Sequence, residues 1–147
     1  MAPAESDFNA AVAVLFDGGS ILLIKRKERP GDPWSGDIAF PGGFRKGDET
    51  GEQTASRECV EESGIMPAEM KFLGRFSSLH GNVSVNAYFS RVGRSDPAPG
   101  EEVQSAFWAP VTELADSGAS YRWGGHVIWG LTYRIIRQLL SIDGILS

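Results

Sequence analysis

A run of glycine, glutamate and arginine residues at fixed intervals constrains this chain more than any other feature of its sequence. In order, the run reads Gly43, five residues, Glu49, seven residues, and then Arg57-Glu58-Cys59-Val60-Glu61-Glu62-Ser63-Gly64-Ile65. Residues three and four apart share a helix face, so the glutamates at 58, 61 and 62 are expected to lie together. Like charges at this spacing destabilise a solvated helix, whereas Mg²⁺ prefers such oxygen ligands and would remove the repulsion. The run therefore predicts a metal site on one helix.

Local signals define the ends of this helix. Thr50 and Gln53 are spaced as a capping box, and Gly64 stands where a helix often ends in a glycine. We therefore predict a helix from about Gly51 to Ser63. Ala55 and Cys59, four residues apart, form its inward face, which leaves the glutamates toward a cleft.

The segment from Gly43 to Ile65 resembles the Nudix box of the Nudix hydrolases, with every fixed Gly, Glu and Arg in place. The resemblance implies an α/β/α sandwich with a central mixed sheet between helices. It also implies hydrolysis of a nucleoside diphosphate linked to another group, with Mg²⁺ or Mn²⁺ as cofactor. The metal ligands that it implies are Glu58, Glu61, Glu62 and the carbonyl of Gly42.

The resemblance further implies that Arg57 orients Glu58. It implies that Glu49 either lies next to the metal ligands without binding the metal itself, or touches a metal through water. The base that activates water is left open. Family members place it either in the box, which here offers Glu58 or Glu62, or on a later loop, where Glu102 is the candidate.

Segments outside the box resemble the coenzyme A diphosphatase subgroup of this family. They are Leu22-Leu23-Ile24-Lys25-Arg26, Gly36-Asp37-Ile38-Ala39-Phe40-Pro41-Gly42-Gly43 and Val127-Ile128-Trp129-Gly130-Leu131-Thr132. The substrate contacts expected on this basis are Lys25, Arg26, Arg29, Phe40 and Gly43. The sequence departs from the subgroup at Asp32, where the pattern has a second arginine that Arg29 would have to replace. The alternatives are a broad nucleoside di- or triphosphate or ADP-ribose pyrophosphohydrolase, and a Nudix-like domain that binds a nucleotide without turnover.

Hydrophobic runs and turn residues predict strands around the glutamate helix. The expected elements are strands at Ala10–Phe16, Ile21–Lys25, Met70–Leu79, Val83–Val92 and Ala106–Pro110, a short apolar stretch at Ile38–Phe40, a turn at Pro41-Gly42-Gly43, and a helical turn at Val111–Ala115. A C-terminal helix is expected to carry Ile128, Leu131, Ile135, Leu139 and Ile142 on one face. Strands with an inserted helix and a final helix favour a mixed sheet packed between helices. We expect one domain over residues 1–147, with residues 1–8 as a flexible N-terminus.

Composition narrows the environment and the partners. The chain is 41% hydrophobic and 22% charged, and no apolar run is long enough to span a bilayer, so we expect a cytoplasmic protein without membrane contact. Residues 1–7 lack the features of a signal peptide, and one cysteine permits no internal disulfide. A net charge of −5 argues against nucleic-acid binding but not against a phosphate substrate, and the resemblance implies a small nucleotide-type substrate as the partner. A homodimer is the assembly that base rates favour.

Histidine and aromatic residues receive mostly structural interpretations. His80 and His126 are expected to be surface or capping residues, not catalytic ones. Trp123, Trp129 and Tyr133 are expected to pack in the core and not to stack on a base. Trp34 is left open between packing its own loop and facing a ligand.

Overall fold

The structure is a computed structural model that describes residues 7–31, 36–78, 82–142 and 144–145. The expectations for Asp32, Trp34 and His80 lie outside these residues. Phe8, expected in a flexible N-terminus, is instead only 5% exposed and belongs to the core. The guanidinium of Arg45 lies 4.6 Å from the centre of its ring, so this part of the N-terminal segment is tied to the domain.

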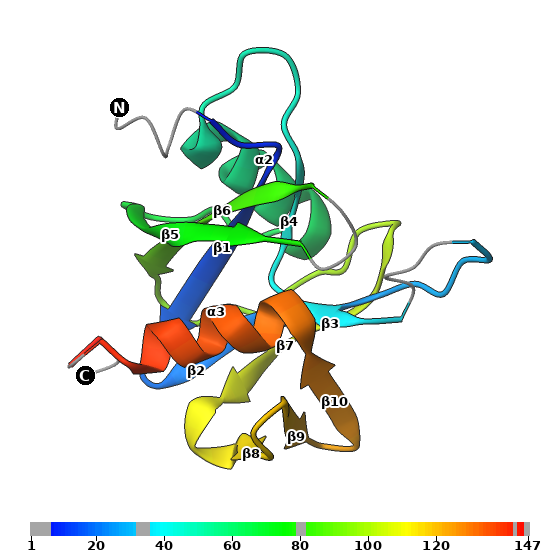
Figure 1. Cartoon of the computed structure of the whole chain (residues 1–147), viewed down its shortest axis with the longest axis vertical. Coiled ribbons are helices and arrows are strands. Elements are labelled where there is room, and N and C mark those ends of the chain that lie inside the picture. Colours follow the sequence, from blue (N-terminus) through cyan, green and yellow to red (C-terminus); the bar gives the residue numbers. More distant parts are fainter. Residues whose placement is uncertain (1–6, 32–35, 79–81, 143, 146–147) are drawn as a thin grey trace.

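A seven-stranded mixed sheet forms the centre of the fold (Figure 1). Its strands are β1 (Ala10–Asp17), β2 (Ser20–Arg26), β3 (Ile38–Ala39), β4 (Gly42–Phe44), β5 (Lys71–Ser77), β6 (Ser84–Arg91) and β7 (Val103–Pro110). The order is β3-β2-β1-β6-β5, with β4 also paired to β1 and β7 to β2. Only the β1–β6 pairing is parallel among the described strands, and the expected hairpin joins β1 to β2 at Asp17 and Ser20.

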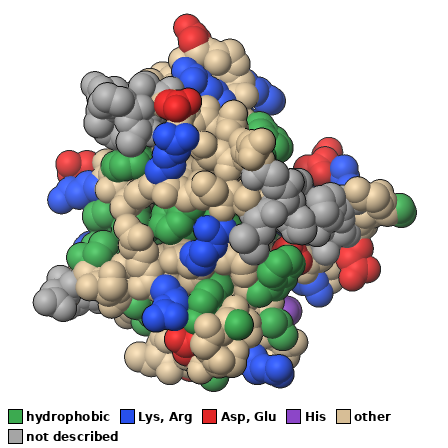
Figure 2. All heavy atoms as spheres, viewed as in Figure 1, with side chains coloured by type: hydrophobic (Ala, Val, Ile, Leu, Met, Phe, Trp, Pro, Cys, Tyr) green, Lys and Arg blue, Asp and Glu red, His purple; other side chains and the backbone are tan. Residues whose placement is uncertain are grey.

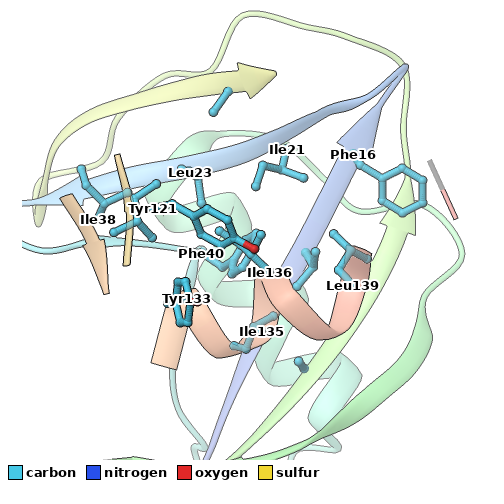
Figure 3. Packing of buried hydrophobic residues seen from close by; sticks show 14 of the residues in the cluster. Phe16, Ile21, Leu23, Ile38, Phe40, Tyr121, Tyr133, Ile135, Ile136 and Leu139 are labelled. Atoms are coloured by element: carbon cyan, nitrogen blue, oxygen red, sulfur yellow. The ribbon is translucent and has the colours of Figure 1, made fainter. Parts of the chain in front are cut away.

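Two helices cover opposite faces of this sheet, as the α/β/α expectation required. Helix α2 (Gly51–Ser63) buries Ala55 and Cys59 against Ala11, Ala13 and Leu15 of β1. Helix α3 (Gly130–Leu140) packs on the other face, where the cluster in Figure 3 combines its buried side chains with alternate residues of β1 and β2. The period of two along the strands thus divides the apolar residues between two cores. Burial raises the pKa of the Cys59 thiol to about 11, which keeps it protonated.

The C-terminal segment differs from the prediction. A second sheet of three short strands, β8 (Ala115–Asp116), β9 (Ser120–Trp123) and β10 (His126–Trp129), precedes α3. Ile128, expected in the helix, lies in β10, and Ile142 lies beyond the helix end. The pair Gly124-Gly125 turns the chain between β9 and β10 with positive φ angles of 55° and 81°, a hairpin signal that the apolar periodicity concealed.

The expected turn at residues 41–43 is also wrong, because Gly42–Phe44 forms strand β4 against β1. A β-carbon at Gly42 would lie 2.5 Å from the carbonyl oxygen of Ala11, so only glycine permits this approach. Strand β7 also begins three residues earlier than expected, at Val103. Both differences arise because cross-strand pairing extends regular structure into segments with weak local preference.

Two observations concern the surface. Among the described residues, no helix is long and apolar enough to cross a bilayer. Acidic and basic side chains are interspersed over the face of the molecule shown in Figure 2.

Candidate active site

Arg57, in helix α2, is the centre of a polar network. Its Nε donates to Glu49 Oε2 at 2.7 Å, its Nη1 to Glu58 Oε1 at 2.5 Å, and its Nη2 to the carbonyl oxygen of Phe44 at 3.1 Å. Glu49 also accepts hydrogen bonds from the Lys46 amide and the Thr54 hydroxyl. The guanidinium therefore joins helix α2 to the loop before it and fixes the carboxylate of Glu58.

These contacts shift the acidity of both partners. The hydrogen bond from Arg57, together with the Lys46 amide, lowers the pKa of Glu49 to about 2. The hydrogen bond to Glu49 raises the pKa of Arg57 above its usual range. Both groups therefore stay charged across the physiological pH range.

Glu62 holds the second carboxylate of the site in a buried position. It is 6% exposed, and its Oε1 accepts a 2.7 Å hydrogen bond from the amide of Gly42. Burial raises the pKa of Glu62 to about 7, the Gly42 hydrogen bond opposes this rise, and the charge of Glu58 adds to it. A buried carboxylate of this kind beside a second one would be stabilised in its charged form by a cation.

Both carboxylates line a cleft of about 600 Å³ between the sheet and the start of α3. Gly43 stands directly against Glu58, since a β-carbon at Gly43 would lie 2.5 Å from Glu58 Oε2. Of the residues predicted for the site, the cleft is lined by Arg26, Phe40, Gly42, Gly43, Glu58, Glu62 and Glu102.

Glu61 takes a different position from its two neighbours. Its side chain is 52% exposed, forms an ion pair with Arg57 at 3.6 Å, and does not line the cleft. Accordingly, no three acidic, histidine or cysteine side chains of the described part of the chain are grouped around one potential metal position. Of the metal ligands that the resemblance implies, Glu58, Glu62 and the Gly42 backbone face the cleft. Mg²⁺ is commonly held by one or two carboxylates, waters and substrate phosphates, so this donor set fits it.

Glu102 and Arg29 form an ion pair at the edge of the cleft. Arg29 Nη2 lies 2.6 Å from Glu102 Oε2, and both side chains are more than half exposed. Glu102 lines the cleft, whereas Arg29 and Lys25 do not. The basic residues expected to contact substrate are therefore separated, with Arg26 alone of the three facing the cleft.

An irregularity in strand pairing marks the position of Arg26. Lys25 pairs with Ser105 of β7 but Arg26 pairs with Val103, so the register shifts between them. Such bulges redirect side chains. The positive charge of Arg26 is near enough to Glu62 to lower its pKa, against the larger effect of burial.

Lys46 and Trp129 are among the cleft residues that the site prediction did not include. Lys46 lines the cleft, and a basic residue within the Gly43–Glu49 interval was the available signal. Trp129, expected in the core, is 42% exposed and also lines it. This expectation is wrong because Trp129 ends strand β10, at the point where the chain enters α3 beside the cleft.

Trp123 and Tyr133 pack as expected, whereas His126, expected at the surface or at a cap, is half-buried and stacked on an aromatic ring. His126 stacks on Phe107 with ring centres 5.6 Å apart, and Trp123 stacks on the same ring at 5.3 Å. Tyr133 is buried and donates a hydrogen bond to Asp116.

Comparison with known proteins places this geometry in context. The model of the NUDIX domain family matches residues 7–125. An ADP-ribose pyrophosphatase of Methanocaldococcus jannaschii is 44% identical over 71 residues, which cover 45% of this chain and 40% of that protein. An 8-oxo-dGTP diphosphatase of Haemophilus influenzae is 32% identical over 74% of this chain and 79% of its own length. The chain spans about half the length, or less, of three curated relatives that it matches.

Solved structures show the same fold. The NUDIX domain of Shewanella oneidensis NrtR, in a complex with ADP ribose, superimposes with a TM-score of 0.74 at 19% identity. The match covers 96% of this chain and 92% of that one.

Proposed function

This chain belongs to the NUDIX domain family, and from that premise we propose that it is a pyrophosphohydrolase acting on a diphosphate linkage in a nucleoside diphosphate derivative. One observation carries the proposal. Glu58 and Glu62, held by Arg57 and by the Gly42 amide, face the same cleft. A non-catalytic nucleotide-binding domain would have no need of two crowded carboxylates and the network that holds them.

A divalent cation, Mg²⁺ or Mn²⁺, would be held by Glu58, Glu62 and the Gly42 carbonyl, with Glu61 as a fourth candidate ligand. When bound, it would neutralise charge on the phosphoryl oxygens and acidify a coordinated water. The chain's own residues have separate tasks. Arg57 keeps the Glu58 carboxylate oriented, and Glu49 holds Arg57 in place.

Substrate positioning falls to residues around these carboxylates. Arg26 and Lys46 line the cleft and would contact phosphate oxygens. Glu58, Glu62 and Glu102 are the three candidates for the base that takes a proton from the attacking water. Of these, Glu102 is paired with Arg29, which would have to release it.

The substrate that we favour is an ADP-linked compound such as ADP-ribose. A matched relative is an ADP-ribose pyrophosphatase, and a similar solved domain was determined with ADP ribose. Among the described residues that line the cleft, Arg26 and Lys46 are the cationic ones, which suits a diphosphate. The extra 3′-phosphate of coenzyme A would call for further cationic contacts. Coenzyme A is the second candidate, because the three sequence segments resemble its diphosphatases.

A substrate panel tests the proposal. The panel contains ADP-ribose, coenzyme A, dephospho-coenzyme A, dinucleoside polyphosphates and nucleoside triphosphates, each assayed with Mg²⁺, Mn²⁺ or EDTA. We expect metal-dependent release of AMP from ADP-ribose, with Glu62→Gln lowering kcat by about 100-fold or more.

Glu52→Gln is the matched control, since it removes the same charge from the exposed first turn of α2 and should leave kcat unchanged. Absence of hydrolysis for every compound with either metal would refute the proposed activity. Preference for coenzyme A over ADP-ribose would make the second candidate the substrate.

A further inference from the structure

The amino-terminal end of helix α3 meets the cleft without a cap. Its first three residues, Gly130, Leu131 and Thr132, line the cleft wall. The N-cap residue is Trp129, and in the described part of the chain no side-chain hydrogen bond caps this end of the helix. Among the same residues, no oxygen outside the helix accepts from the amides of Leu131 or Thr132. Both amides are therefore open to a ligand in the cleft.

Helix α2 shows how this chain satisfies a helix start when it uses its own residues. The Thr50 side chain accepts from the Gln53 amide, and Glu52 places a carboxylate in the first turn. The first turn of α3 contains no acidic residue. A helix start carries a partial positive charge, equivalent to about half an elementary charge. In α3, neither a cap nor an acidic residue of the first turn compensates this charge.

Thr132 adds a hydroxyl to the same end of α3. The residue is only 7% exposed and lines the cleft. Helical side chains lean toward the amino terminus, so a side chain at the third helical position lies over the open end. No described residue forms a hydrogen bond with the Thr132 hydroxyl. A buried hydroxyl without a partner is unfavourable, and an acceptor oxygen on a ligand would satisfy it.

The chemistry of this wall is opposite to that of the metal wall. Glu58 and Glu62 reach the cleft from α2, on the other face of the sheet, and attract a cation. The start of α3 presents only hydrogen-bond donors and a positive dipole end. Free amides at a helix start bind phosphate without a cationic side chain. The two walls therefore suit two different charged groups.

From these observations we infer that the start of α3, together with the Thr132 hydroxyl, binds a phosphate monoester at a site separate from Glu58 and Glu62. The three acceptor oxygens of such a group match two amides and one hydroxyl. The monoester either belongs to the substrate, in addition to its diphosphate, or is a free phosphate. Only the first source rests on the proposed function for the identity of the ligand.

Titration of the metal-free protein with inorganic phosphate tests the site directly. EDTA keeps Glu58 and Glu62 without a cation, so these carboxylates repel the anion. We expect the amide signals of Leu131 and Thr132 to shift in proton–nitrogen correlation NMR spectra. Thr132→Val should weaken phosphate binding about tenfold or more, because it removes a hydroxyl that donates to a charged oxygen. Thr132→Ser should retain most of the affinity.

Ser90→Ala is the matched control. Ser90 is 1% exposed, its hydroxyl also has no partner among the described residues, and it does not line the cleft. Its replacement should leave phosphate affinity unchanged, and thermal unfolding verifies that each variant is folded. Equal affinity in wild type and Thr132→Val would overturn the inference. Signal shifts confined to Arg26 and Lys46 would place the phosphate elsewhere in the cleft and would also overturn it.

Coenzyme A and dephospho-coenzyme A distinguish the two sources, because they differ by one phosphate monoester. Isothermal titration calorimetry in EDTA measures both affinities. If the monoester belongs to the substrate, coenzyme A should bind more tightly than dephospho-coenzyme A, and Thr132→Val should abolish the difference. If the site serves free phosphate, neither affinity should depend on Thr132. An equal loss for both compounds in Thr132→Val would place Thr132 at the diphosphate and would refute a separate site.

The phosphate titration also separates this inference from the proposed function. If phosphate binding depends on Thr132 but no panel compound is hydrolysed, the anion site stands and the hydrolase assignment falls. If ADP-ribose is hydrolysed and phosphate binding ignores Thr132, the reverse holds.

Discussion

At the scale of single residues, Arg57 connects the chemistry of the site to its stability. Its guanidinium donates to Glu49 in the loop, to Glu58 in α2 and to the carbonyl of Phe44 in β4. It thereby connects these three segments and balances the negative charges of the two glutamates. The planar fork of arginine suits this geometry, which a lysine ammonium could not reproduce. The orientation of Glu58 and the folding of the loop before α2 therefore depend on the same ion pairs.

Glu49→Gln is expected to make the stability of the metal-free protein less dependent on acid pH. The pKa of Glu49 falls from 4.5 to about 2 on folding, so its stabilising contribution is complete above pH 4.5 and is lost as pH falls toward 2. Wild type should therefore unfold at a higher temperature than Glu49→Gln at pH 7. The difference in Tm should narrow below pH 4.5, as followed by circular dichroism. A constant difference from pH 7 to pH 3 would show that Glu49 is not the titrating group.

At the scale of elements, short-range signals fix helix α2 almost completely. The Thr50 side chain accepts from the Gln53 amide while Gln53 caps the Thr50 amide, and Gly64 ends the helix with φ of 73°. The predicted and observed bounds agree because each cap involves residues within four positions of one another. Strand β10 shows the opposite case, since its four residues are defined by pairing with β9.

The close packing of β4 on α2 predicts a specific effect for Gly43→Ala. The new β-carbon would lie 2.5 Å from Glu58 Oε2 and must displace that carboxylate from its place beside the cleft. We expect kcat for the best panel substrate to fall by about 100-fold while the protein remains folded.

Gly47→Ala is a control for the loss of a loop glycine, because a β-carbon there meets nothing within 4 Å, although its φ of 57° adds backbone strain. Kinetics and circular dichroism spectra of both variants check the prediction. A Gly43→Ala variant with wild-type kcat would show that the Glu58 position is not critical.

At the scale of the whole molecule, stability rests on two apolar cores, one on each face of the sheet. The core under α3 is the larger, and it joins the helix to the three-stranded sheet through Tyr121 and Tyr133, whose ring centres are 4.8 Å apart. Because the cleft lies between the central sheet and the start of α3, docking of this helix also positions Trp129.

Two adjacent leucines near the end of α3 test the contribution of this core. Leu139 is fully buried, whereas Leu140 is 40% exposed. Leu139→Ala should lower the free energy of unfolding by about 2–5 kcal/mol, because it removes buried methyl groups and leaves a cavity. Leu140→Ala should change it by less than about 0.5 kcal/mol. Urea denaturation of the two variants gives both values, and similar losses would contradict the observed orientation of α3.

The sequence by itself determined the glutamate helix, the first hairpin, the mixed sheet between helices and the family resemblance. Each of these depends on caps, turns or periodic patterns whose residues are close together in the chain. Only the tertiary structure decided that Glu62 meets the Gly42 amide, that Glu61 turns away from the cleft, that Gly42–Phe44 is a strand, and that Trp129 lines the cleft. These features depend on burial and on pairing between distant residues, and such long-range contacts leave no local pattern in the sequence.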